Sequence, residues 1–227
     1  HTRCLSDWSS DVCSSDLNLA ENTTTHWHGL IVDPDNDGGP AKTINSAGGT
    51  LSYNFKLNQR ASLNWYHPHP HMNTGKQINL GMAGLFIVRD SEETALGLPS
   101  GEFEIPLMIR DATLDKNGNL SYKATSSGFV GQIPLVNGTQ TPYLSVKPTW
   151  YRFRVLNSSN ARVFRLSINN NGTAKSMMLI GNDGGLLDKS YEELTIDFAP
   201  AERLDILVNR SEEHTSELQS LRHLVCR

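Results

Sequence analysis

The chain has 227 residues and a formal net charge of -4, with 20 Lys and Arg against 24 Asp and Glu, and a mean hydropathy of -0.40. This balance, without any basic run, excludes the electrostatic footprint of a protein that binds nucleic acid or an anionic membrane. No apolar run approaches the roughly twenty residues of a transmembrane helix, so we expect no membrane segment. The charged fraction of 19% is ordinary for a globular domain.

The two ends of the chain are polar stretches without apolar periodicity. Residues 7–17, DWSSDVCSSDL, and residues 210–220, RSEEHTSELQS, can be encoded by one oligonucleotide read on its two strands. That oligonucleotide resembles a sequencing-library adapter. We therefore expect residues 1–17 and 210–227 to be adapter-like additions, and we exclude Cys4, Cys13 and Cys226 from functional reasoning.

Between these ends, the chain reads as short strands separated by turns rich in Gly, Pro, Asn and Asp. Residues 51–57 alternate apolar and polar side chains, which is typical of a half-buried strand. Further strands are predicted at 61–66, 85–88, 104–109, 151–156, 163–168, 177–180, 194–198 and 204–208. Because no segment has a long helical period, the pattern predicts an all-β fold of antiparallel sandwiches or barrels.

The strands divide into two predicted domains. The polar segment 91–103 contains two glycines and a proline, and we interpret it as a linker. Residues 18–90 then form a first domain and residues 104–209 a second one.

All histidines between the two ends fall into two tight clusters. Residues 26–28, HWH, and 67–69, HPH, are each a His-x-His motif in strand-like surroundings, where residues two apart face the same side. Their Cα atoms lie about 6.6 Å apart in an extended strand, which suits neighbouring metal ions better than chelation of one ion. An exposed or hydrogen-bonded pair explains one such motif equally well, but two motifs together predict a metal site.

The predicted ligands are His26, His28, His67 and His69. A set of neutral imidazoles without thiolate or carboxylate favours copper, zinc, iron or nickel over calcium and magnesium. His71 follows Pro70, which interrupts the strand, and we expect a supporting or surface role for it. Residues 33–38 resemble the start of a calcium-binding EF-hand loop, but Ile44 stands where that loop needs a glutamate, so we reject a calcium site.

Several segments resemble the multicopper oxidases, laccase-like enzymes built of cupredoxin Greek-key domains. THWHGL, DGGP, WYHPHPH and GMAGLFIVRD are similar to the first domain of the family. IPLVNG, YRFRVLNSSNARVF, GNDGGLL and APAERLDILV are similar to the second domain of bacterial three-domain members. The resemblance spans nearly all of residues 18–209. It implies two cupredoxin-like β-sandwich domains, the first of them truncated because the family has further strands before HWHG.

The resemblance also implies roles for individual residues. His26 would ligate the type 2 copper, and His28, His67 and His69 the type 3 pair. Asp37, in the DGGP turn, matches an acid that delivers protons near the copper cluster. Since reduction of dioxygen consumes protons, a nearby carboxylate is a reasonable relay. Without the resemblance, an Asp that caps its own turn is an equal explanation.

By this resemblance the parent protein couples one-electron oxidation of a phenol, aromatic amine, pigment or cuprous ion to reduction of dioxygen to water at a trinuclear copper cluster. The type 1 copper ligands and the remaining cluster ligands belong to a third domain in the family, and their motifs do not occur here. We therefore expect the chain alone to be inactive. The alternatives are a non-catalytic copper-binding cupredoxin module and a zinc site on the same histidines. Family members are commonly exported, which implies a periplasmic or extracellular location.

Overall fold

The structure, a computed structural model, describes residues 21–42, 49–170 and 172–211. Residues 1–17, the three cysteines and all of 210–227 except Arg210 and Ser211 lie outside these ranges. The elements in chain order are β1 (His26–His28), η1 (Pro34–Asn36), β2 (Ser62–His67), α1 (Thr74–Asn79), β3 (Gly84–Val88), α2 (Ser91–Ala95), η2 (Gly101–Phe103), β4 (Glu104–Leu114), β5 (Leu120–Ser121), β6 (Ile133–Val136), β7 (Trp150–Asn157), β8 (Phe164–Asn170), β9 (Thr173–Lys175), β10 (Met177–Asn182), β11 (Gly185–Glu193), β12 (Thr195–Phe198) and β13 (Arg203–Asn209). Strands dominate the described chain, which confirms the all-β prediction.

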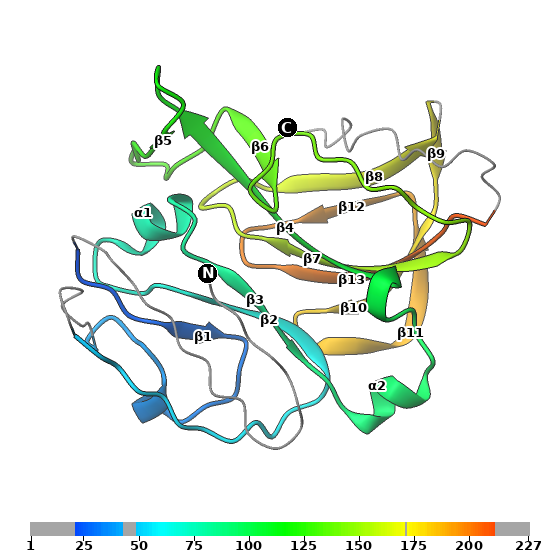
Figure 1. Ribbon diagram of the computed structural model, residues 1–227, viewed down its shortest axis with the longest axis horizontal. Coiled ribbons are helices and arrows are strands. Elements are labelled where there is room, and N and C mark those ends of the chain that lie inside the picture. The colour runs from blue at the N-terminus through cyan, green and yellow to red at the C-terminus, as the bar shows by residue number, and fades with distance from the viewer. Residues whose placement is uncertain (1–20, 43–48, 171, 212–227) are drawn as a thin grey trace.

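The strands form two units that lie side by side (Figure 1). The first unit holds the antiparallel sheet β1-β2-β3. The second unit holds the sheet β11-β10-β13-β7-β4-β5, with β6 also paired to β4, and the smaller sheet β12-β8-β9. Strands β4 and β7 run parallel, whereas the other named strands pair antiparallel.

The main apolar core lies between the two sheets of the second unit. Its buried side chains come from both sheets and are Ile109, Val136, Val155, Phe164, Leu166, Met177, Phe198, Leu204, Ile206 and Val208. Removing this apolar surface from water is the dominant force that holds the two sheets together.

A second, smaller apolar cluster joins the two units. Trp65 on β2 and Ile78 on α1 pack with Leu156 on β7, and Ala201 from the loop before β13 packs against them. Two polar contacts reinforce this junction: Asn160 Nδ2 donates to the carbonyl of Gly75 at 3.2 Å, and Arg110 donates to the carbonyl of Asn79. The first unit is therefore held in place by residues of the second.

The predicted strand at residues 51–57 is wrong as a strand, although its pattern of burial is correct. Half-buried and exposed residues alternate from Leu51 to Leu57, but none of them pairs with a described strand. The apolar side chains instead pack on the face of β1, where Trp27 contacts Tyr53 and Phe55 edge to face with ring centroids 5.4 Å apart in each case. The alternation of apolar and polar residues indicates which side of a segment is buried. It does not show whether a neighbouring strand is present to form the backbone hydrogen bonds of a sheet.

The predicted linker, residues 91–103, connects β3 of the first unit to β4 of the second (Figure 1). It contains α2 and η2. Asp90 caps α2 by accepting from the Glu93 amide at 2.7 Å, and its other carboxylate oxygen accepts from the Ala61 amide at 2.7 Å. The domain boundaries themselves stay a prediction.

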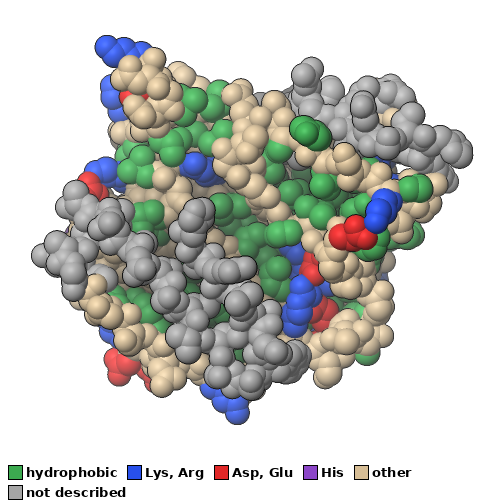
Figure 2. All heavy atoms as spheres, viewed as in Figure 1, with side chains coloured by type: hydrophobic (Ala, Val, Ile, Leu, Met, Phe, Trp, Pro, Cys, Tyr) green, Lys and Arg blue, Asp and Glu red, His purple; other side chains and the backbone are tan. Residues whose placement is uncertain are grey.

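In the face shown in Figure 2, Lys, Arg, Asp and Glu side chains of the described residues are mixed and form no single-sign patch. This mixture agrees with the near-neutral composition. Among the described helices, none is long and apolar enough to cross a membrane.

Candidate metal centre

Strand pairing brings the two His-x-His motifs together. β1 pairs with β2 so that His26 lies opposite His67 and His28 lies opposite Trp65. His26 and His28 face the same side because side chains in a strand alternate. β2 ends at His67, and the chain then turns through Pro68 and brings His69 to the same place.

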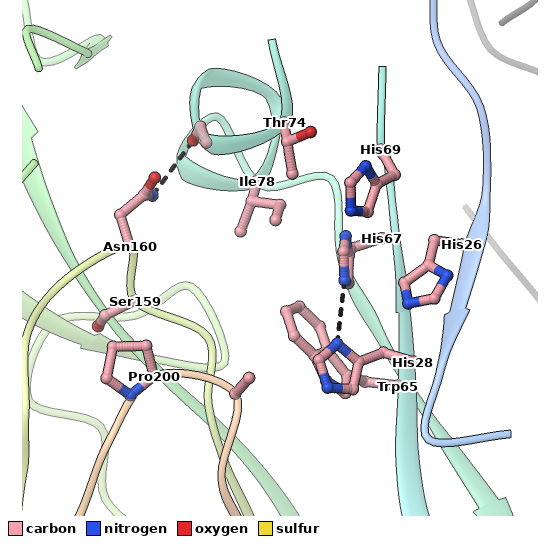
Figure 3. Close-up of a pocket in the computed structure, with 12 residues that line it drawn as sticks. His26, His28, Trp65, His67, His69, Thr74, Ile78, Ser159, Asn160 and Pro200 are labelled. Atoms are coloured by element: carbon pink, nitrogen blue, oxygen red, sulfur yellow. Dashed lines mark hydrogen bonds between the residues drawn. The ribbon is translucent and has the colours of Figure 1, made fainter. Parts of the chain in front are cut away.

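All four imidazole rings converge, as Figure 3 shows. The His26 ring centroid lies 5.6 Å from that of His28, 5.1 Å from that of His67 and 5.4 Å from that of His69. One ring nitrogen from each of His26, His28 and His67 lies within 4.8 Å of the others, a spacing that permits metal binding. His28 Nδ1 and His67 Nε2 are 3.3 Å apart, close to the roughly 3.3 Å between two nitrogens on one tetrahedral metal ion.

The hydrogen bonds of the other ring nitrogens orient the ligands. His26 Nδ1 donates to the Asp37 carboxylate at 2.8 Å, and His67 Nδ1 donates to the Pro68 carbonyl at 2.8 Å. Each bond leaves Nε2 as the unprotonated nitrogen, the usual arrangement of a metal-binding histidine. In the metal-free chain, the Nε2 lone pair of His67 faces His28 Nδ1 at 3.3 Å. His69 Nδ1 is buried without a hydrogen-bond partner among the described residues. A buried nitrogen in that state fits a metal ligand, since a metal ion would satisfy its lone pair.

Burial keeps two of the imidazoles neutral. Desolvation, together with the charges of Arg203 and His26, lowers the pKa of His28 from 6.5 to about 4. Desolvation also lowers the pKa of His67 to about 4, although the hydrogen bond to Pro68 opposes the shift. Both rings therefore present a lone pair at neutral pH, as metal ligation requires.

These depressed pKa values predict that the metal-free chain loses stability as the pH falls from 6.5 towards 4. In the unfolded chain both groups return to a pKa near 6.5, so it binds more protons than the folded chain across this window. Urea unfolding at several pH values, on the wild type and on a His28→Gln/His67→Gln double variant, checks the prediction. The double variant should show the shallower decline, and equal slopes would contradict the assignment.

The histidines line a cavity of about 430 Å³ at the junction of the two units. Trp65 lies beside them with its ring tilted against theirs, its centroid 4.2 Å from that of His67 and 4.9 Å from that of His28. Across the cavity lie residues of the second unit and of α1, which are Ser159, Asn160, Pro200, Ala201, Thr74, Gly75 and Ile78 (Figure 3).

The structure thus places the four predicted ligands in one cluster and the predicted acid, Asp37, beside His26. His71 is exposed and does not line the cavity. The residues on the far wall of the cavity were not predicted from the sequence. The NSSN run at 157–160 and the APAE run at 199–202 were the only available signals, and turn residues alone do not reveal which site a loop borders.

Comparisons with known proteins give the family of this chain. Residues 15–93 match the sequence model of the multicopper oxidase family. A multicopper oxidase from Staphylococcus haemolyticus is 40% identical over 195 residues, which cover 86% of this chain and 43% of that protein. The crystal structure of the multicopper oxidase McoA from Aquifex aeolicus superposes with a TM-score of 0.83 at 39% identity, over 88% of this chain and 45% of that one. The chain belongs to the multicopper oxidase family.

Membership confirms the cupredoxin-like all-β fold, and it implies copper as the metal and oxidoreductase chemistry for the family. A laccase from Bacillus subtilis is 36% identical over 207 residues, 82% of this chain and 40% of that protein. A cell division protein, FtsP of Proteus mirabilis, is 37% identical over 188 residues, 81% of this chain and 39% of that protein. The chain therefore spans less than half the length of the relatives it matches.

Proposed function

We propose that this chain is the part of a laccase-like multicopper oxidase that supplies half of a trinuclear copper cluster. His26 holds the type 2 copper, and His28, His67 and His69 hold the type 3 pair. The observation that carries the proposal is the convergence of four imidazoles, with the 3.3 Å contact between His28 Nδ1 and His67 Nε2. When bound, copper would supply the one-electron redox chemistry that couples substrate oxidation to reduction of dioxygen.

The chain's own residues orient and protect this site. Asp37 orients the ring of His26 and also accepts a hydrogen bond from the Trp27 amide at 3.0 Å. One carboxylate therefore binds both the His26 side chain and the backbone of β1. The pKa of Asp37 is lowered: burial opposes ionisation, but the bonds from Trp27 and His26 outweigh it. Asp37 is thus a carboxylate at neutral pH, placed to orient His26 and to accept protons beside the cavity.

Replacing Asp37 with asparagine is expected to weaken copper binding by about 10- to 100-fold, because the ring of His26 loses its charged partner. Calorimetric titration of Cu²⁺ into the metal-free chain measures the change. Asp35→Asn is a matched control, since Asp35 lies in the same turn with its side chain exposed. Equal affinities for the wild type and Asp37→Asn would contradict the orienting role.

Metal identity tests the proposal directly. The metal-free chain is titrated separately with Cu²⁺ and Zn²⁺, and the copper sample is examined by electron paramagnetic resonance for nitrogen hyperfine coupling. We expect tighter binding of copper than of zinc, following the usual order of divalent metal affinities. The copper spectrum should show hyperfine coupling to several nitrogen ligands. Tight zinc binding without copper uptake would replace the copper assignment with the zinc site.

The oxidase function belongs to the whole parent protein. We propose that the chain alone does not reduce dioxygen, because it carries only half of the cluster's ligands. Residues 21–209 exchanged into the matching region of the Staphylococcus haemolyticus relative should give a copper-loaded protein that consumes oxygen with a phenolic substrate. The same chimera with His67→Gln should not. Strong oxidase activity from the chain alone would refute the proposal that dioxygen reduction needs the whole parent protein.

A non-catalytic copper-binding module is the second candidate, because one relative is named for cell division and not for an oxidase activity. The two candidates differ in the parent gene. Downstream H-x-x-H-x-H and H-C-H segments would supply the remaining copper ligands and favour the oxidase, whereas their absence would favour the binding module. A periplasmic or extracellular location stays a prediction of the family resemblance.

A further inference from the structure

Arg203, the first residue of β13, lies beside the histidine cluster although it belongs to the second unit. Its side chain is 5% exposed. The guanidinium donates to three backbone carbonyls: Nε to Leu63 at 3.0 Å, Nη1 to Ala201 at 2.9 Å and Nη2 to Asp183 at 3.1 Å. One side chain therefore ties together segments that are up to 140 residues apart in the sequence.

Two of the three carbonyls that Arg203 contacts belong to segments of the metal centre. Leu63 is on β2, four residues before His67 on the same strand. Ala201 forms part of the far wall of the cavity and has a positive φ of 71°, an unfavourable conformation for alanine that its surroundings must hold. The guanidinium thus connects the strand that carries His67 to the opposite wall of the cavity.

The guanidinium also packs on the turn that follows His28. A Cβ atom at Gly29 would lie 2.8 Å from Arg203 Nη2 and 2.4 Å from Asn64 Oδ1, so a larger residue would displace these side chains. Gly29 also has a φ of +90°, which other residues adopt at a steric cost. His28 is therefore followed by a backbone turn that rests directly on the Arg203 guanidinium.

We propose that Arg203 is a positioning residue for the metal centre, which holds the turn after His28 and the strand of His67 in register so that their imidazoles meet. This inference rests on the proposed copper site for its functional meaning. The planar guanidinium of arginine donates to three carbonyls at once. Lysine carries the same charge, but its single ammonium group does not reproduce this geometry. Arg203→Lys therefore separates geometry from charge.

The first test uses the metal-free chain labelled with ¹⁵N at its histidines. In the wild type, the contact between His28 Nδ1 and His67 Nε2 should give a protected imidazole N–H signal. In Arg203→Lys and Arg203→Met, the His28 and His67 signals should shift or broaden towards those of free imidazole. The His26 signal should stay, because Asp37 holds that ring independently of Arg203.

The control for a merely structural role is Phe164→Leu. This substitution loosens the core of the second unit, and Phe164 does not line the cavity. It should lower the unfolding midpoint and leave all four imidazole signals unchanged. If Arg203→Lys also lowers the midpoint but leaves the His28 and His67 signals unchanged, the proposal is overturned. If Arg203→Met does not fold, Arg203→Lys still decides the question.

A copper titration adds a second readout. Arg203→Lys should weaken Cu²⁺ binding about 10- to 100-fold, the usual effect of losing a group that orients a ligand, while Phe164→Leu should not. Equal copper affinity of Arg203→Lys and the wild type would count against the positioning role. A wild-type chain that binds no copper would refute the proposed function, and the metal-free imidazole spectra would still decide the role of Arg203.

Discussion

Replacing His67 with glutamine is expected to lower the copper affinity of the chain by more than the roughly 10- to 100-fold that follows loss of a ligand's supporting partner. His67 contacts His28 directly and is buried, so it is central to the cluster. Glutamine keeps a polar side chain of similar length but lacks the imidazole lone pair that binds soft and borderline metals. The fold should persist, because the apolar core of the second unit lies elsewhere.

The matched control is His71→Gln, which changes an exposed histidine in the same HPHPH run. It should bind copper as the wild type does. Titration calorimetry gives the affinities, and circular dichroism checks that both variants keep their strands. Equal losses in the two variants would show that exposed His71 contributes as much as buried His67, which would contradict a site formed by the cavity histidines alone.

Replacing Arg154 with methionine is expected to lower the free energy of unfolding by about 3–5 kcal/mol, the cost of breaking a buried ion pair by removing one partner. Arg152 and Arg154 are two apart on β7 and face the same side, each with a side chain that is 2% exposed. They share three carboxylates, those of Glu93 on α2, Glu104 on β4 and Asp205 on β13.

The geometry of this cluster explains the size of the effect. Arg152 binds Asp205 through two nitrogens at 2.9 and 2.6 Å, and Arg154 Nε binds Glu104 at 2.8 Å. Burial opposes ionisation of Glu104, but hydrogen bonds from Arg89 and Arg154 outweigh it and lower its pKa. Without Arg154, Glu93 and Glu104 would stay buried with too little positive charge beside them.

Chemical denaturation measures the change, with Arg165→Met as the control. Arg165 binds Asp197 through two nitrogens at 2.6 Å, but both side chains are about half exposed. Water screens that pair, so its loss should change the stability little. Similar losses for the two variants would contradict the claim that burial sets the energy. Since Glu93 belongs to α2, Arg154→Met should also expose the segment between the units to protease.

This cluster was not predicted from the sequence, although one local sign of it was present. The R-x-R spacing at 152–154 places both guanidinium groups on one face of a strand, as the H-x-H spacing does for the imidazoles. Their partners lie 48 to 61 residues away in the chain. Similarly, the linker was predicted from its polar composition, but Glu93 within it is buried because a charge can be buried when opposite charges surround it.

By itself, the sequence determined the all-β class, most strands and the shared face of His26 and His28 on β1, whereas His69 follows the end of β2 and reaches the cluster through the turn at Pro68. The fold class, the strands and this shared face depend on local periodicity, which the backbone imposes wherever a strand forms. Only the tertiary structure decided that His26 lies opposite His67, that residues 51–57 pair with no described strand, and that Arg203 reaches the turn after His28. Those features depend on register and on the packing of distant segments, which no local pattern encodes.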